Sequence, residues 1–231
     1  MIREAVGPGK GFASCPRSRY SAWMEPIIIL FELAVLIFSV IVHEISHGAV
    51  AYWLGDETAY RMGRLTLNPV RHIDPFGSVI LPLLLSIPVL FGAQPIIIGW
   101  AKPVPYNPYN LKNPKTGAGI IALAGPVSNI IIAFVFALLV SFTGQGLAIS
   151  VAFTYVILIN LMLAVFNMVP IPPLDGSKIL TALLPDRSPI IDFLERNSMV
   201  LILAFIFLGF SLVGEVVEAL YGALMAFTGV A

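Results

Sequence analysis

The stretch VIVHEISHGAVAYWLG, residues 40–55, places two histidines and a glutamate inside an almost wholly apolar run. Ionisable side chains at membrane depth cost free energy unless they are paired or serve a function. On a helix, His43 and His47 project from one face and can bind one metal ion. Glu44 lies about 100° further round the helix, within reach of a metal-bound water. The pattern H-E-x-x-H therefore favours a catalytic zinc site over buried histidines that bond carbonyls or line a proton path.

The composition around this stretch is that of a polytopic membrane protein. Apolar residues make up 58% of the 231 residues and charged residues 11%, against about 25% charged in a soluble domain. The formal net charge is zero, so we expect no nucleic-acid partner. The single cysteine, Cys15, excludes an intramolecular disulfide and a cysteine-based metal cluster.

Long apolar runs and their interruptions predict the fold. Runs of spanning length cover residues 26–54, 117–142, 147–169 and roughly 199–227. A further apolar run, residues 76–98, contains Pro82, Pro88 and Pro95 and is typical of a re-entrant hairpin. Proline and asparagine then predict a loop or short β-hairpin near residues 99–110.

We therefore expect an all-α polytopic membrane protein with about five to six transmembrane or re-entrant helical segments. Residues 26–231 form a single integral-membrane domain in this interpretation. The polar N-terminal residues 1–25 are predicted to be a disordered tail.

The distribution of lysine and arginine predicts the orientation. These residues cluster at 3–19, 61–71, 102–115 and 178–196, and the link at 143–146 has none. By the positive-inside rule the link is external and the last three clusters are cytoplasmic. The basic tail would then lie outside, which the rule disfavours. Translation from Met24, with residues 1–23 not translated, would remove the conflict, and N-terminal sequencing of the native protein tests this hypothesis.

A catalytic zinc site needs a third protein ligand beside an open position for water. The one other histidine is His72, and we expect it to pair with Asp74 or with backbone. The third ligand is thus expected to be a carboxylate. Asp175, in PPLDG after the 147–169 run, lies on the same side of the membrane as His43 and His47. The alternatives for Asp175 are a helix cap near Ser177 or an Asp-Gly turn.

Several separated motifs carry a resemblance to a known family. HEISH (43–47), AGPVSN (124–129) and NMVPIPPLDG (167–176) resemble the site-2 protease family of intramembrane zinc metalloproteases. RLTLNPVRHIDPFGS (64–78) and GWAKPVPYNP (99–108) are similar to its compact branch, which lacks PDZ and CBS domains. The likeness extends from about residue 30 to residue 184.

The resemblance implies a role for each matching residue. His43, His47 and Asp175 would ligate one Zn²⁺ per chain, and Glu44 would activate the water. Asn167 would help to position the substrate or the oxyanion. Asn160 lies seven residues earlier and shares a helix face with Asn167, so both can point at the site. Hydrogen bonding between helices is the alternative for both asparagines.

The function expected from these features is zinc-dependent hydrolysis of a peptide bond in or near a transmembrane segment of a membrane protein. A single-span protein or a remnant signal peptide is the expected substrate, in the bilayer of a prokaryotic cell, with the active site toward the cytoplasm. The oligomeric state is not indicated. The alternatives are a divalent-metal transporter, although the chain has no internal repeat or histidine-rich loop, and an inactive relative that binds membrane segments.

Overall fold

A computed structural model of the chain describes residues 19–80, 102–143, 147–186 and 188–229. These residues are helical or irregular, and none of them forms a β-strand. Among them, four helical stretches are long and apolar enough to cross a membrane. They are Ile27–Trp53, Pro114–Thr143, Ala148–Asn167 and Ser198–Phe227. The predicted all-α polytopic membrane fold is thereby confirmed.

The first helix, α1 (Arg19–Trp53), carries the opening sequence motif. It begins at Arg19, so the tail predicted to be disordered over residues 1–25 is helical from Arg19 on. A formed helix adds one hydrogen bond for each further residue, so it can extend past the apolar run that predicts it. At the other end Gly55 has φ of +106°, a conformation that glycine adopts without strain and that ends helices.

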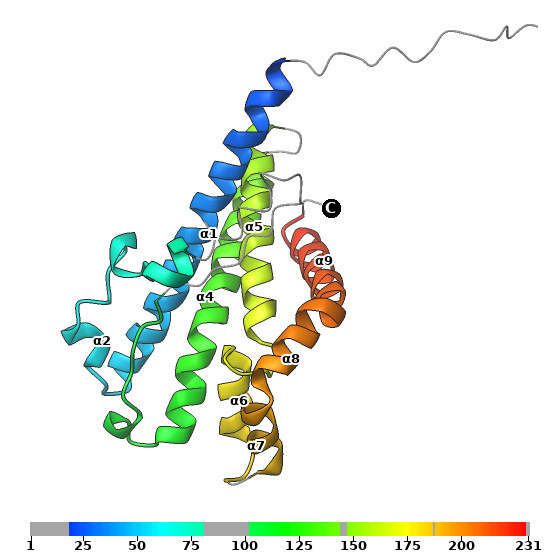
Figure 1. The fold of residues 1–231 in the computed structure, drawn as a ribbon. Helices are drawn as coiled ribbons and strands as arrows, with labels where there is room; N and C mark the ends of the chain where they lie inside the picture. The colour runs from blue at the N-terminus through cyan, green and yellow to red at the C-terminus, as the bar shows by residue number, and fades with distance from the viewer. Residues whose placement is uncertain (1–18, 81–101, 144–146, 187, 230–231) are drawn as a thin grey trace, which may run out of the picture.

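Two further spans run alongside α1. Helix α4 (Pro114–Thr143) packs against both α1 and α5 (Ala148–Asn167), as Figure 1 shows. Small buried residues of α4, such as Ala122, Ala133 and Ala137, allow the neighbouring backbones to approach closely. The main apolar core lies between α4, α5 and α9 and contains Ala133, Ala137, Val140, Ile157, Leu161, Val213, Val217 and Met225.

The outward faces of the spans are apolar as well. On α1, Ile27 is 66% exposed and Leu30 is 68% exposed. Such exposure would be costly in water, but in lipid an outward apolar side chain keeps an apolar environment. The exposed surface therefore agrees with an integral membrane protein.

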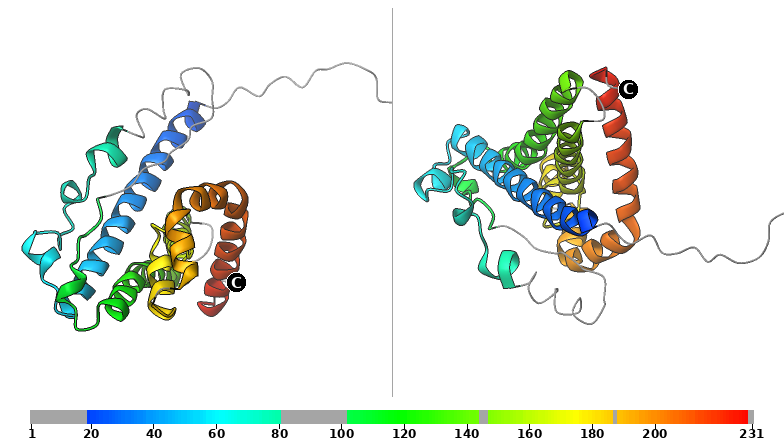
Figure 2. Two further views of the ribbon diagram at one scale, coloured as in Figure 1. Left: turned by 60° about the horizontal axis from the view of Figure 1, so that its bottom comes forward. Right: turned by 90° about the horizontal axis from the view of Figure 1, so that it is seen from above.

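Short helices gather at one end of the bundle. Helices α6 (Asp175–Leu183) and α7 (Pro189–Arg196) lie beyond the C-terminal end of α5 (Figure 1). The chain then continues through α8 (Ser198–Ala204) and a π-helical turn, Phe205–Gly209, into α9 (Phe210–Phe227). Helix α9 packs along α5, on the far side from α1 (Figure 2). This topology brings α6 to the end of the bundle where α1 finishes.

The described parts of the connection between α1 and α4, residues 54–80 and 102–113, contain only short helices. They are α2 (Thr58–Arg61), the 3-10 helices Pro69–Arg71 and Pro108–Asn110, and the π-helix Pro75–Ile80. The predicted re-entrant hairpin over residues 76–98 lies outside the described residues from residue 81 on.

The segment 102–107 is described, and it forms no strand. Of the predicted loop or short β-hairpin near residues 99–110, the loop alternative holds for these residues. Pro103 and Pro105 have no N–H group for a β-ladder, which explains the missing strand. Residues 99–101 lie outside the described part of the chain.

A buried carboxylate fixes this segment to the end of α1. Asp56 is fully buried. Its Oδ2 accepts a hydrogen bond from the backbone N–H of Asn107 at 2.7 Å, and its Oδ1 accepts one from Asn110 Nδ2 at 2.6 Å. Oδ1 also accepts from the backbone N–H and the hydroxyl of Thr58, at 3.1 and 2.5 Å. Asp56 therefore joins α1, α2 and the segment 102–107.

Burial alone would raise the pKa of the Asp56 carboxyl. The hydrogen bonds from Thr58, Asn110 and Asn107 outweigh burial and lower this pKa below its ordinary value. A group whose pKa is lower in the folded state stabilises the fold above its unfolded-state pKa. That contribution is lost as the pH falls through the folded-state pKa.

We expect Asp56→Asn to lower the free energy of unfolding at pH 7 by about 1–3 kcal/mol, because a carboxylate oxygen that accepts is replaced by an amide that donates. The variant should also lose less stability than the wild type between about pH 5 and pH 2. Thermal unfolding in detergent at several pH values measures both effects. Asp192→Asn, at an exposed position on α7, is the matched control. Equal pH dependence of Asp56→Asn and wild type would contradict the assignment.

Candidate metal centre

The two histidines of the opening motif meet on one face of α1. His43 is 5% exposed and His47 is 9% exposed. Their rings lie edge to face with centroids 4.7 Å apart. A spacing of four residues produces this arrangement, because it returns the side chains to one face of the helix.

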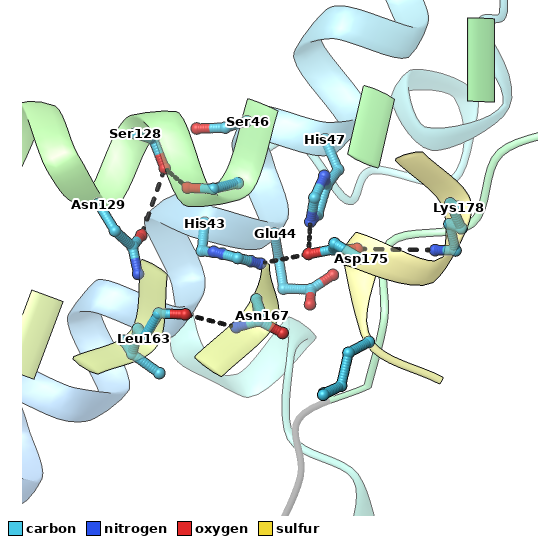
Figure 3. Close-up of polar contacts among 12 residues, drawn as sticks. His43, Glu44, Ser46, His47, Ser128, Asn129, Leu163, Asn167, Asp175 and Lys178 are labelled. Atoms are coloured by element: carbon cyan, nitrogen blue, oxygen red, sulfur yellow. Dashed lines mark hydrogen bonds and ion pairs between the residues drawn. The ribbon is translucent and has the colours of Figure 1, made fainter. Parts of the chain in front are cut away.

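Asp175 reaches the same place from the other end of the sequence. It is the first residue of α6 and is 7% exposed. Its Oδ2 lies 3.1 Å from His43 Nε2 and 3.2 Å from His47 Nε2 (Figure 3). The three side chains predicted as metal ligands are thus brought together, and all of them are buried.

The segment before α6 explains how Asp175 comes so close. Helix α5 ends at Asn167, and Pro170, Pro172 and Pro173 follow within the turn. Prolines cannot continue the helix, because they lack the N–H donor. The chain therefore turns back sharply, and α6 starts beside the histidines and not further along the axis of α5.

The donor atoms fit a zinc ion. Zinc ligands at 2.0–2.2 Å in a tetrahedral site lie about 3.3 Å from each other, close to the two separations between Asp175 and the histidines. His47 Nδ1 lies 2.7 Å from the backbone carbonyl of Ile121. Since a carbonyl only accepts, Nδ1 carries a proton, and Nε2 is the nitrogen left to bind a metal. Two imidazoles and one carboxylate leave a coordination position open, as catalytic zinc sites do.

The carboxyl group of Asp175 is held in the form that binds a metal. Burial by itself would raise its pKa, but hydrogen bonds with His43 and His47 outweigh burial and lower the pKa below its ordinary value. A metal ligand must be deprotonated. The carboxylate is therefore ionised at neutral pH.

Helix α4 closes the site from a third direction. Gly125 faces the histidines so closely that a Cβ atom there would lie 2.5 Å from His43 Nε2 and 2.6 Å from His47 Cε1. No side chain fits in this space. Gly125 therefore allows α4 to pack against the imidazole pair and bring the carbonyl of Ile121 to His47.

Glu44 lies beside the three candidate ligands without being one of them. Its Oε2 accepts a hydrogen bond of 2.8 Å from the backbone N–H of Val104. The glutamate, both histidines and Asp175 line one cavity of about 140 Å³. Its wall also includes Val104, Tyr106, Asn167 and Lys178. The carboxylate and the candidate ligands thus share one space that can admit water.

The two asparagines that were predicted to point at the site have different surroundings in the structure. Asn167 lines the cavity, and its Nδ2 donates to the backbone carbonyl of Leu163 at 2.9 Å. Asn160 is fully buried and donates to Ser39 Oγ of α1 at 3.0 Å. For Asn160 the alternative of hydrogen bonding between helices is therefore confirmed.

His72 contacts backbone, as expected, with its Nε2 2.9 Å from the carbonyl of Thr66. Two features of the site had no separate prediction. The backbone N–H of Val104 has no signature in the sequence, because every residue except proline carries one. Lys178 could have been found from its position three residues after Asp175 on the same helix face.

Comparisons with known proteins agree with this geometry. The sequence model of peptidase family M50 matches residues 144–209. The chain is 41% identical over 170 residues to "Putative zinc metalloprotease YwhC" of Bacillus subtilis, across 69% of this chain and 72% of the relative. It is 32% identical over 154 residues to "Putative zinc metalloprotease MJ0611" of Methanocaldococcus jannaschii, across 67% of this chain and 71% of the relative.

A third relative, "Putative zinc metalloprotease Rip2" of Mycolicibacterium smegmatis, is 28% identical over 153 residues, across 64% of this chain and 55% of the relative. No solved structure gives a significant match. The names of the relatives and the donor set of His43, His47 and Asp175 indicate the same metal, zinc. The chain belongs to peptidase family M50, the site-2 protease family that its motifs resemble.

Proposed function

We propose that this chain is an intramembrane endopeptidase, which hydrolyses a peptide bond in or near a transmembrane segment of a membrane-protein substrate. The observation that carries the proposal is the position of the site within a candidate span. His43, Glu44 and His47 all belong to the span Ile27–Trp53, and they share their cavity with Asp175. A water-accessible cavity at this depth supplies what lipid lacks, a place for hydrolysis.

The active site faces the cytoplasm in this proposal. His43 and His47 lie in the last turns of α1, at the end of the bundle where α2, α6 and α7 gather (Figure 1). The basic clusters 61–71 and 178–196 belong to the same end. The positive-inside rule assigns that end to the cytoplasmic side of the membrane.

Four side chains and one backbone N–H group of the cavity have a part in the proposed chemistry. His43, His47 and Asp175 hold the zinc ion, which, when bound, polarises the scissile carbonyl and makes water more acidic. Glu44 accepts the proton of the attacking water and passes it to the nitrogen of the leaving amine. The bond from the backbone N–H of Val104 orients the carboxylate of Glu44 while it does so.

The substrate enters as an extended chain. A helical substrate hides its carbonyl groups in internal hydrogen bonds, so it must unwind before it can be cut. The segment 102–107 places Val104 and Tyr106 in the wall of the cavity. It can contact the unwound chain through side chains and backbone carbonyls but not as a ladder strand, because Pro103 and Pro105 have no N–H group and Val104 N–H donates to Glu44. Asn167 contacts the peptide near the scissile bond in this proposal. Its Nδ2 donates one hydrogen to the carbonyl of Leu163, and the second hydrogen and Oδ1 are left for the peptide.

We expect Glu44→Gln to lower the rate of cleavage by at least about 10²-fold, because the amide cannot accept the proton. Zinc content should stay at the wild-type level, since Glu44 is not a ligand. The measurement incubates the purified wild type and variant with a panel of single-span proteins and a signal peptide, with and without a chelator. Glu195→Gln, at an exposed position of α7, is the control.

Cleavage by Glu44→Gln at the wild-type rate would overturn the assignment of the base. Zinc flux into proteoliposomes by a wild type that cuts none of the panel would favour the transporter alternative.

We expect Asp175→Ala and Gly125→Ala to lower the zinc affinity by at least about 10–100-fold, the range seen when the surroundings of a ligand are altered. The first removes a ligand, and the second places a Cβ atom 2.5 Å from the His43 ring. Metal analysis after dialysis against a zinc buffer measures the effect. Gly214→Ala on α9 is the matched control, because nothing lies within 4 Å of its added Cβ. Wild-type zinc content in Asp175→Ala would contradict the ligand set.

A further inference from the structure

Lys178 brings a positive charge to the cavity. It belongs to the first turns of α6, three residues after Asp175. Its Nζ lies 3.8 Å from Asp175 Oδ1 and 5.8 Å from the centroid of the Tyr106 ring. Among the described residues that line the cavity, Lys178 is the one lysine or arginine.

The two oxygen atoms of Asp175 have different neighbours. Oδ2 faces the Nε2 atoms of His43 and His47, at 3.1 and 3.2 Å. Oδ1 faces Lys178. Figure 3 shows Lys178 on the opposite side of the carboxylate from His43. The carboxylate therefore presents one oxygen to the histidine pair and the other to an ammonium group.

The different neighbours of the two Asp175 oxygens affect the coordination position that a catalytic zinc ion keeps open for water. A carboxylate can bind a metal through one oxygen or through both. Binding through both would place an additional ligand on the ion and crowd the position that a catalytic zinc site keeps for water. A cation that holds the outer oxygen opposes this second mode of binding, because that oxygen would have to leave its ion pair.

We propose that Lys178 is a positioning residue of the metal centre, whose ammonium group holds Oδ1 of Asp175 so that the carboxylate binds zinc through Oδ2 alone. The inference rests on the zinc site of the proposed function and does not depend on the substrate. At 3.8 Å the contact between Lys178 and Asp175 is an ion pair and not a hydrogen bond, so its effect on the carboxylate is electrostatic.

A competing explanation is an ordinary helix-surface ion pair. The Lys178 side chain is 44% exposed, and that of Asp175 is 9% exposed. Exposed pairs three residues apart contribute little to stability. A pair with no effect on the metal would leave metal affinity and coordination unchanged, so measurements on the metal itself separate the two explanations.

The test compares Lys178→Met, which keeps the long aliphatic stem without the charge, with Lys178→Arg, which keeps the charge. We expect Lys178→Met to bind zinc several-fold more tightly than wild type, because the carboxylate gains a second donor atom and the site loses a nearby positive charge. The Co²⁺-substituted protein should show a weaker visible absorption band, because intensity falls as coordination rises from four to five ligands. Lys178→Arg should restore both properties. Lys112→Met, an exposed lysine of the described residues, is the matched control.

The metal-free melting temperature of each variant reports folding separately. Wild-type zinc affinity and an unchanged Co²⁺ spectrum in a folded Lys178→Met would overturn the proposal. So would an effect confined to the KM for substrates with acidic residues, which would assign Lys178 to substrate binding. Neither metal measurement needs a substrate. A protein that binds zinc as expected and cuts nothing would therefore refute the proposed function and leave this inference standing.

Discussion

The contact of Asp175 with His43 and His47, which belong to the candidate span Ile27–Trp53, is the one on which the other features of the site depend. Without a partner, each of these buried polar groups would destabilise the fold. Their closeness requires the helical spacing of the histidines, the proline-containing turn after α5 and the glycine face of α4 at Gly125. Three helical elements are therefore fixed relative to one another by one small polar cluster.

A second polar cluster serves the neighbouring segment. Asp56 accepts four hydrogen bonds and joins the end of α1 to the chain around Asn107. Three residues before Asn107, the backbone of Val104 donates to Glu44. The position of the Glu44 carboxylate is thus coupled through main-chain atoms to a carboxylate twelve residues further along the chain. The same contacts hold the wall of the cavity and orient Glu44, the proposed base, so this segment serves both stability and mechanism.

The sequence alone predicts the centre of the site and much less of its surroundings. The spacing of His43 and His47 needs only a helix, and Asp175 follows from the chemistry of zinc and the order of the spans. The N–H of Val104 could not be predicted, because a main-chain donor carries no residue signature. In the sequence Asp56 is an ordinary residue of a polar loop. Its contacts with Asn107 and Asn110 follow only from the fold. The helical start at Arg19 does not follow from the sequence, because composition indicates where a chain is apolar and not how far a helix propagates.

The donor that orients Glu44 belongs to the main chain, and this affects how the segment can change over evolutionary time. Any amino acid other than proline at position 104 keeps the N–H group, so drift at this site is tolerated as far as the glutamate is concerned. Proline already occupies positions 103 and 105, so neither neighbour has an N–H group to offer. For this hydrogen bond any residue except proline is acceptable at position 104, while the burial of Val104, 7% exposed, limits the side chains that can pack there.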